Sequence, residues 1–158
     1  MKWFALVLIA TAAVLAGCRD SGRMTGVTNA ATNTFSASLA GGQAVPPTGS
    51  GATGAARFDV MSDGTIHWSL QTTGLDTVLA AHIHAGKRGE NGDVVVPLYT
   101  GGPTQDLNVT GTITDPAQIA AAVWLFRSDS AYVNVHTPRF IGGEIRGQVL
   151  TAGGSDLR

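Results

Sequence analysis

Two histidines separated by a single residue are the first feature of this chain that could do chemistry. His82 and His84 lie in the run Ala-Ala-His-Ile-His, and residues two apart on a β-strand project from the same face. A third histidine, His136, ends a second strand-like run, Tyr-Val-Asn-Val-His. If the two strands are neighbours, three imidazoles converge. Three histidines that leave coordination positions open are a ligand set suited to copper or zinc.

Further polar side chains are expected on the same face as His136, which points away from the core. Some lie on the strand of His136 and others on the strand that follows it. They are Tyr132, Asn134, Glu144, Arg146 and Gln148. The connection at residues 138–143 is short enough for a hairpin, which would place His136 beside Glu144 with Cβ atoms about 5 Å apart. The same register places Asn134 beside Arg146, and Tyr132 beside Gln148. We expect the Glu144 carboxylate to orient the His136 ring and to fix its tautomer.

The same residues admit an interpretation without metal. A network of His, Glu, Arg, Asn and Tyr side chains can satisfy buried polar groups beneath a covering loop, or can contact a ligand. Signals of other chemistry are weak, because the sequence holds no G-x-S-x-G elbow, no P-loop and no H-E-x-x-H motif. Residues 49–54 match G-x-G-x-x-G, but Pro46 and Pro47 precede them and a predicted strand follows. A dinucleotide site needs a strand before this motif and a helix after it. With none of these signals in place, an enzyme is not expected.

The elements that must position these residues are short strands separated by turn residues. This spacing is typical of a sandwich or a barrel. The predicted strands cover residues 34–40, 55–61, 65–73, 79–85, 93–99, 107–114, 131–137 and 144–150. One short helix is expected at about 115–126, because Asp115 can cap it and Pro116 suits its first position. Its apolar stripe would be Ile119, Ala122, Val123 and Phe126. The sequence therefore predicts an all-β fold, an antiparallel Greek-key-like β-sandwich of about eight strands with one short helix.

The composition limits the classes of partner. The chain has 158 residues, which favours one domain, and 10 basic against 11 acidic residues give a formal charge of −1. No basic surface for nucleic acid is expected. The single cysteine, Cys18, excludes an intrachain disulfide and a thiolate zinc site.

The N-terminus predicts export and attachment to a membrane. Lys2 precedes the uncharged apolar run 3–16, which is too short to span a bilayer and fits a secretory signal. Leu-Ala-Gly-Cys at residues 15–18 resembles a bacterial lipoprotein signal, which implies cleavage before Cys18 and acylation of that residue. We therefore expect a signal peptide at 1–17, a lipidated Cys18 with a flexible linker to residue 33, a domain at 34–150 and a tail at 151–158. The expected location is the cell envelope, at the outer membrane or facing the periplasm, with the lipid as membrane contact.

Four blocks of sequence are similar to the CHRD domain, which is named for the animal protein chordin and also occurs alone in bacterial secreted proteins. The blocks are FSASLAGGQAVPP from residue 35, AHIHAGKRGENGD from 81, YVNVHT from 132 and GEIRGQ from 143. The resemblance implies a β-rich extracellular module, with His82, His84, His136, Glu144 and Arg146 as signature positions and no activity attached.

Two hypotheses for the function follow. The first is a non-enzymatic binding module for a protein or small ligand, which uses the glycine-rich loops at 40–54 and 85–92 as its contact surface. The alternative is a copper- or zinc-binding protein that uses the three histidines. The fold also has a weaker likeness to Cu,Zn superoxide dismutase, but that two-metal enzyme needs more histidines than this chain has.

Overall fold

The computed structural model describes residues 29–152 and contains nine strands and one α-helix. The predicted signal peptide, Cys18 and most of the predicted linker lie outside the described residues. The strands are β1 (Ala31–Ala40), β2 (Thr53–Met61), β3 (Ile66–Thr73), β4 (Ala80–Ala85), β5 (Val94–Tyr99), β6 (Asn108–Ile113), β7 (Ala131–His136), β8 (Ile145–Gln148) and β9 (Leu150–Thr151). A 3₁₀ turn, η1 (Gly41–Gln43), follows β1, and helix α1 (Pro116–Arg127) separates β6 from β7.

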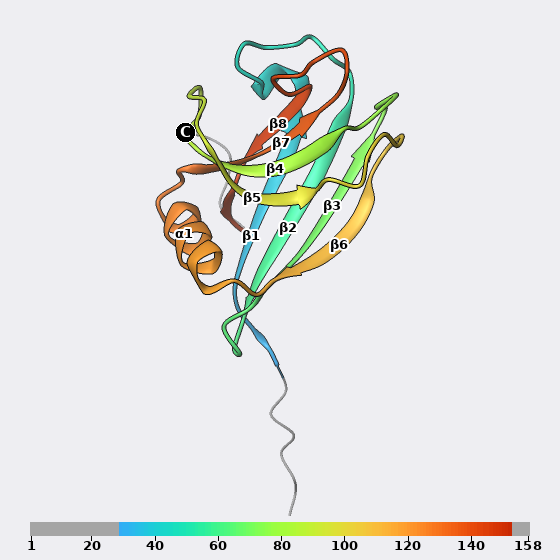
Figure 1. The fold of residues 1–158 in the computed structure, drawn as a ribbon. Helices are drawn as coiled ribbons and strands as arrows, with labels where there is room; N and C mark the ends of the chain where they lie inside the picture. The colour runs from blue at the N-terminus through green and yellow to red at the C-terminus, as the bar shows by residue number, and fades with distance from the viewer. Residues whose placement is uncertain (1–28, 153–158) are drawn as a thin grey trace, which may run out of the picture.

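The strands form one sheet that folds back on itself (Figure 1), with the order β5-β4-β7-β8-β1-β2-β3-β6 and with β9 beside β1. All of the pairings are antiparallel. The two halves of the sheet meet where Ala40, the last residue of β1, pairs with Arg146 of β8. The all-β prediction is confirmed, and the eight predicted strands all form. β1 begins three residues earlier than expected, and the short β9 was not predicted.

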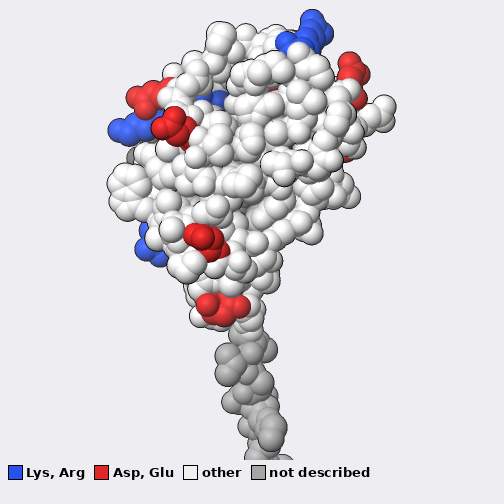
Figure 2. All heavy atoms as spheres, in the orientation of Figure 1, with Lys and Arg blue, Asp and Glu red and all other residues white. Residues whose placement is uncertain are grey.

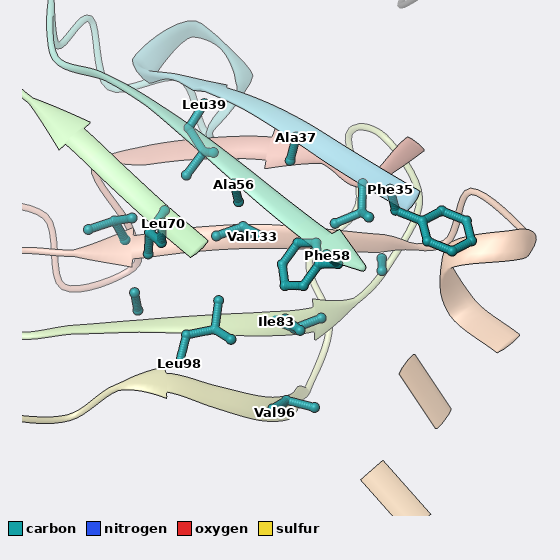
Figure 3. Packing of buried hydrophobic residues seen from close by; sticks show 14 of the residues in the cluster. Phe35, Ala37, Leu39, Ala56, Phe58, Leu70, Ile83, Val96, Leu98 and Val133 are labelled. Carbon is teal, nitrogen blue, oxygen red and sulfur yellow. The ribbon is translucent and has the colours of Figure 1, made fainter. Parts of the chain in front are cut away.

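The core lies between the two halves of the sheet, as Figure 3 shows, with side chains from β1, β2 and β3 facing those from β4, β5 and β7. Phe58 and Leu70 on one half and Ile83 and Val133 on the other are fully buried. Because side chains alternate along a strand, burial of Ile83 and Val133 puts the residues on either side of them on the outer face. This alternation decides where the histidines lie.

Helix α1 begins where the capping pattern predicts. The Asp115 carboxylate accepts hydrogen bonds from the backbone N–H groups of Ala117 and Gln118, both at 2.9 Å, and satisfies donors that a helix start leaves unpaired. The predicted stripe faces the core: Ala122 and Phe126 are buried, and the half-buried Ile119 and Val123 pack against the core. Leu125, which the stripe did not include, is buried as well. The centroid of the Phe126 ring lies 5.1 Å from that of Phe35 and 5.0 Å from that of Phe58, so this residue anchors the helix to the core.

The two ends of the domain differ. β1 starts at the bottom of Figure 1, and the loop after β1 and the β7–β8 connection lie at the top. Charged side chains of both signs are few and scattered over the face in Figure 2, in keeping with the small net charge. Among residues 29–152, no helix is long and apolar enough to cross a membrane.

Candidate metal centre

The three predicted histidines meet on the outer face of the sheet. β4 and β7 are adjacent and antiparallel, and His82 lies opposite Asn134 while Ala80 lies opposite His136. The imidazole centroids are 5.0 Å apart for His82 and His136, and 5.7 Å apart for each of the other two pairs. The expected convergence of rings from separate strands is therefore present in the fold.

The ring nitrogens are close enough to share one ion after a small adjustment. One nitrogen from each of His82, His84 and His136 lies within 4.8 Å of the other two. Zinc–nitrogen bonds of about 2.0–2.1 Å in tetrahedral geometry separate two ligand nitrogens by about 3.4 Å. Rotation of the side chains could provide this change, because only side-chain atoms must move.

Backbone carbonyls fix the tautomer of two rings. Nδ1 of His84 lies 2.9 Å from the carbonyl oxygen of Gly92, and Nδ1 of His136 lies 2.7 Å from that of Ile141. A carbonyl oxygen only accepts, so each Nδ1 carries the hydrogen and each Nε2 keeps its lone pair in the neutral ring. Both Nε2 atoms are buried and have no hydrogen-bond partner. A histidine that donates from one nitrogen and keeps the other free is arranged as a metal ligand is.

His82 contributes the third buried nitrogen. Its Nδ1 is also buried without a partner. Burial, together with the positive charges that His136 and His84 could carry, lowers the pKa of His82 to about 4. The ring is therefore neutral at pH 7, which is the form that coordinates a metal.

His84 is bordered by an aromatic ring and a guanidinium. Burial is the main cause that lowers the pKa of His84; the hydrogen bond to Gly92 opposes this, while the charges of His136 and Arg146 add to it. The Tyr132 ring stacks on the His84 ring at 4.9 Å with an interplanar angle of 11°. The Arg146 guanidinium carbon lies 3.5 Å from the centroid of Tyr132. The Tyr132 ring thus separates a cation from a candidate ligand.

The hairpin register is confirmed, but the predicted partner of His136 is wrong. Tyr132 pairs with Gln148 and Asn134 with Arg146, as expected. The Glu144 carboxylate, however, accepts hydrogen bonds from Ser50 Oγ at 2.6 Å and from Thr137 Oγ1 at 2.7 Å. The Glu144 side chain turns toward Ser50 in the loop before β2 and toward Thr137 just after β7. The Ile141 carbonyl orients His136 instead.

Asn134 and Gln148 tie the sheet to its covering loops. Asn134 Nδ2 donates to the carbonyl of Gly142 at 2.9 Å, and Gln148 Nε2 donates at 2.9 Å to the carbonyls of Gly86 and Asp129. Gly143 has a φ of +115° and lies directly against the Asn134 amide, where a Cβ would clash. Glycine is therefore needed for the connection to fold over the face that carries His136.

The two glycine-rich loops lie against each other beside the histidines. Asn91 Nδ2 donates to the Val45 carbonyl at 2.9 Å, and Thr48 Oγ1 donates to the Glu144 carbonyl at 2.8 Å. Sequence reasoning missed the carbonyls of Gly92 and Ile141, because a backbone group has no sequence signature, and nothing in the sequence marked Ser50 or Thr137 as partners of Glu144.

The four sequence blocks that carry the family resemblance correspond to the parts that build this site. A family model for the CHRD domain matches residues 35–149. The chain belongs to the CHRD-domain family. The comparisons with curated proteins and with solved structures gave no match. The CHRD match covers both loops and strands β1 to β8, so the three-histidine cluster is formed entirely within the CHRD domain.

Proposed function

We propose that this CHRD domain binds one transition-metal ion through His82, His84 and His136. Two observations carry the proposal: each of the three rings has a buried, unpartnered nitrogen, and one ring nitrogen from each histidine lies within 4.8 Å of the other two. Buried polar atoms in proteins almost always have a partner, and an unpaired one costs about 1–3 kcal/mol. A shared ion would give all three nitrogens a partner at once.

The ligands favour copper or zinc. Imidazole suits both metals, whereas calcium and magnesium require oxygen donors. The Nδ1–H groups of His84 and His136 leave Nε2 of each ring without a partner, and the lowered pKa of His82 favours the neutral ring that a metal needs. The proposed role is binding rather than catalysis.

Titration of the full chain with Zn²⁺ and with copper tests the proposal. We expect one equivalent to bind, and the substitutions His82→Ala, His84→Ala and His136→Ala each to abolish or strongly weaken binding. His67→Ala is the matched control, because His67 is exposed on β3, in the other half of the sheet. Binding that survives two of the three cluster substitutions, or that is lost in the control, would contradict the proposal.

We also propose that the domain is held at the cell envelope by acylation of Cys18. Support comes from the apolar run at 3–16 and from the small residues before Cys18. Ala40 at the far end of β1 pairs with Arg146, Arg146 pairs with Asn134, and Asn134 lies opposite His82. A tether joined before Ala31 would therefore leave the cluster at the end of the domain away from the membrane. Cys18→Ala should move the protein from the membrane fraction to the soluble fraction of the producing cells. Retention of that variant in the membrane fraction would refute this part.

A further inference from the structure

A buried guanidinium lies one aromatic ring away from the histidine cluster. Arg146 is 2% exposed, and its guanidinium carbon lies 3.5 Å from the centroid of Tyr132. Tyr132 in turn stacks on His84 at 4.9 Å. The three side chains come from the adjacent strands β8, β7 and β4, so the cation is a fixed neighbour of the proposed metal centre.

The hydrogen bonds that Arg146 donates within residues 29–152 go to neutral groups. Nη2 donates to the Lys87 carbonyl at 2.8 Å, and Nη1 donates to Asn91 Oδ1 at 3.4 Å. Within the described part of the chain, no carboxylate oxygen lies within the 4.0 Å of an ion pair with Arg146. Among acidic residues, the charge of Glu90 acts on Arg146 and the charge of Asp93 acts on His84. Both are exposed, so water screens them more than it screens the buried guanidinium.

This charge distribution discriminates between ions of different charge. The three imidazoles are neutral donors, so the centre keeps the full charge of the ion that it binds. Repulsion from Arg146 grows in proportion to that charge. Because Tyr132 is stacked between Arg146 and His84, the separation of the two charges is on the order of 10 Å, and at an effective dielectric constant of about 20 each additional unit of charge on the ion weakens binding about tenfold. A monovalent ion is penalised less than Zn²⁺ or Cu²⁺.

The number of donor atoms in the cluster also favours a monovalent ion. Among residues 29–152, the cluster contains no Cys, Asp or Glu ligand, and it offers three nitrogens. All three nitrogens are buried from solvent, which limits the access of water as a further ligand. Zinc prefers four ligands, and Cu²⁺ prefers tetragonal N and O sites. Cu⁺ is a d¹⁰ ion that is stable in trigonal coordination by nitrogen.

We propose that the three-histidine cluster is a Cu⁺ site and that Arg146 sets its preference for a monovalent ion. This inference rests on the proposed metal-binding function and names the ion. Arg146 acts through its field on the bound ion, with Tyr132 between them, and is not itself a ligand.

Competition titrations of the full chain test the proposed ion. Cu⁺ affinity is measured under argon against bicinchoninate, and Zn²⁺ and Cu²⁺ affinities are measured against chelators of known strength. The wild-type chain should hold Cu⁺ more tightly than either divalent ion. Tighter binding of Zn²⁺ or Cu²⁺ would overturn the Cu⁺ assignment and leave the three-histidine function intact. Absence of binding by all three ions would overturn both.

Two variants test the role of Arg146. Arg146→Met removes the charge but keeps an unbranched chain against Tyr132, and should raise Cu²⁺ affinity relative to Cu⁺ about tenfold, which is 59 mV in the potential of a one-electron couple. Arg146→Lys keeps the charge and should retain the wild-type ratio. Circular dichroism and thermal unfolding show whether each variant is folded. An unchanged ratio in a folded Arg146→Met protein would refute the role of Arg146, and the wild-type ranking of ions tests the assignment independently of both variants.

Discussion

Acidification of the metal-free protein should lower its free energy of unfolding through the histidine cluster. Burial and the neighbouring rings lower the pKa of His82 from 6.5 to about 4. Between these values the unfolded chain binds a proton that the folded chain excludes, so stability falls as the pH falls. The contribution is fully present above about pH 6.5 and is lost by about pH 4. His84 adds an effect of the same sign, because burial lowers its pKa too.

The size of the change in unfolding free energy follows from the difference between the pKa values of His82 in the unfolded and the folded chain. At 1.36 kcal/mol per pH unit, the interval from 6.5 to about 4 corresponds to about 3 kcal/mol. The His82 ring is only partly buried, and solvent screening reduces the expected contribution to about 1–2 kcal/mol.

Urea unfolding in the presence of a chelator, at several pH values between about 7 and 4, measures this contribution. His82→Asn removes the titrating ring, and its stability should depend less steeply on pH than that of the wild type, by about 1–2 kcal/mol over the range. His67→Asn should follow the wild-type curve. If His82→Asn has the same pH dependence as the wild type, the ring is not held neutral in the fold and the argument fails.

Three other substitutions test how the site is held. Gly143→Ala should destabilise the fold by at least about 1–3 kcal/mol in urea, because the new Cβ would meet the Asn134 amide at a positive φ; wild-type stability would contradict the packing of that connection. Glu144→Gln should weaken the contact with Ser50 and lower stability by about 1–2 kcal/mol. Glu144→Gln should not cause the 10–100-fold loss of metal affinity that is expected when a residue orienting a ligand is replaced. A loss of that size in a titration would show that Glu144 does orient His136. Asp115→Ala should cost about 1 kcal/mol of stability, and a neutral effect on the thermal midpoint would contradict the observed cap.

Much of the local structure could be predicted because strand geometry leaves few choices. The alternation in β7 and β8 and the short connection between them fix the register, since a slip by one residue would turn Val133 and Val135 away from the core. That register correctly paired Asn134 with Arg146 and Tyr132 with Gln148.

Contacts between distant segments could not be predicted from local patterns. β4 lies beside β7 because of the strand order of the whole sheet, which local sequence patterns do not determine. The sequence therefore predicted convergence of the three histidines only if these two strands were neighbours. The Glu144 error has the same origin, because Ser50 reaches the carboxylate from 94 residues away in the chain. The helical period predicted the core-facing stripe of α1, but not that Phe126 would pack on Phe35 and Phe58, which lie far away in the chain.

Nuclear magnetic resonance of the imidazole nitrogens is the most direct test of the metal centre. One equivalent of a diamagnetic ion, Zn²⁺ or Cu⁺, is added to ¹⁵N-labelled full chain, and the ring nitrogens of the four histidines are compared with those of the metal-free protein. The account predicts coordination through Nε2 of His84 and His136 and through Nδ1 of His82, with both Nδ1–H groups retained and His67 unchanged. Cluster resonances that do not respond to either ion, or a response confined to His67, would contradict it.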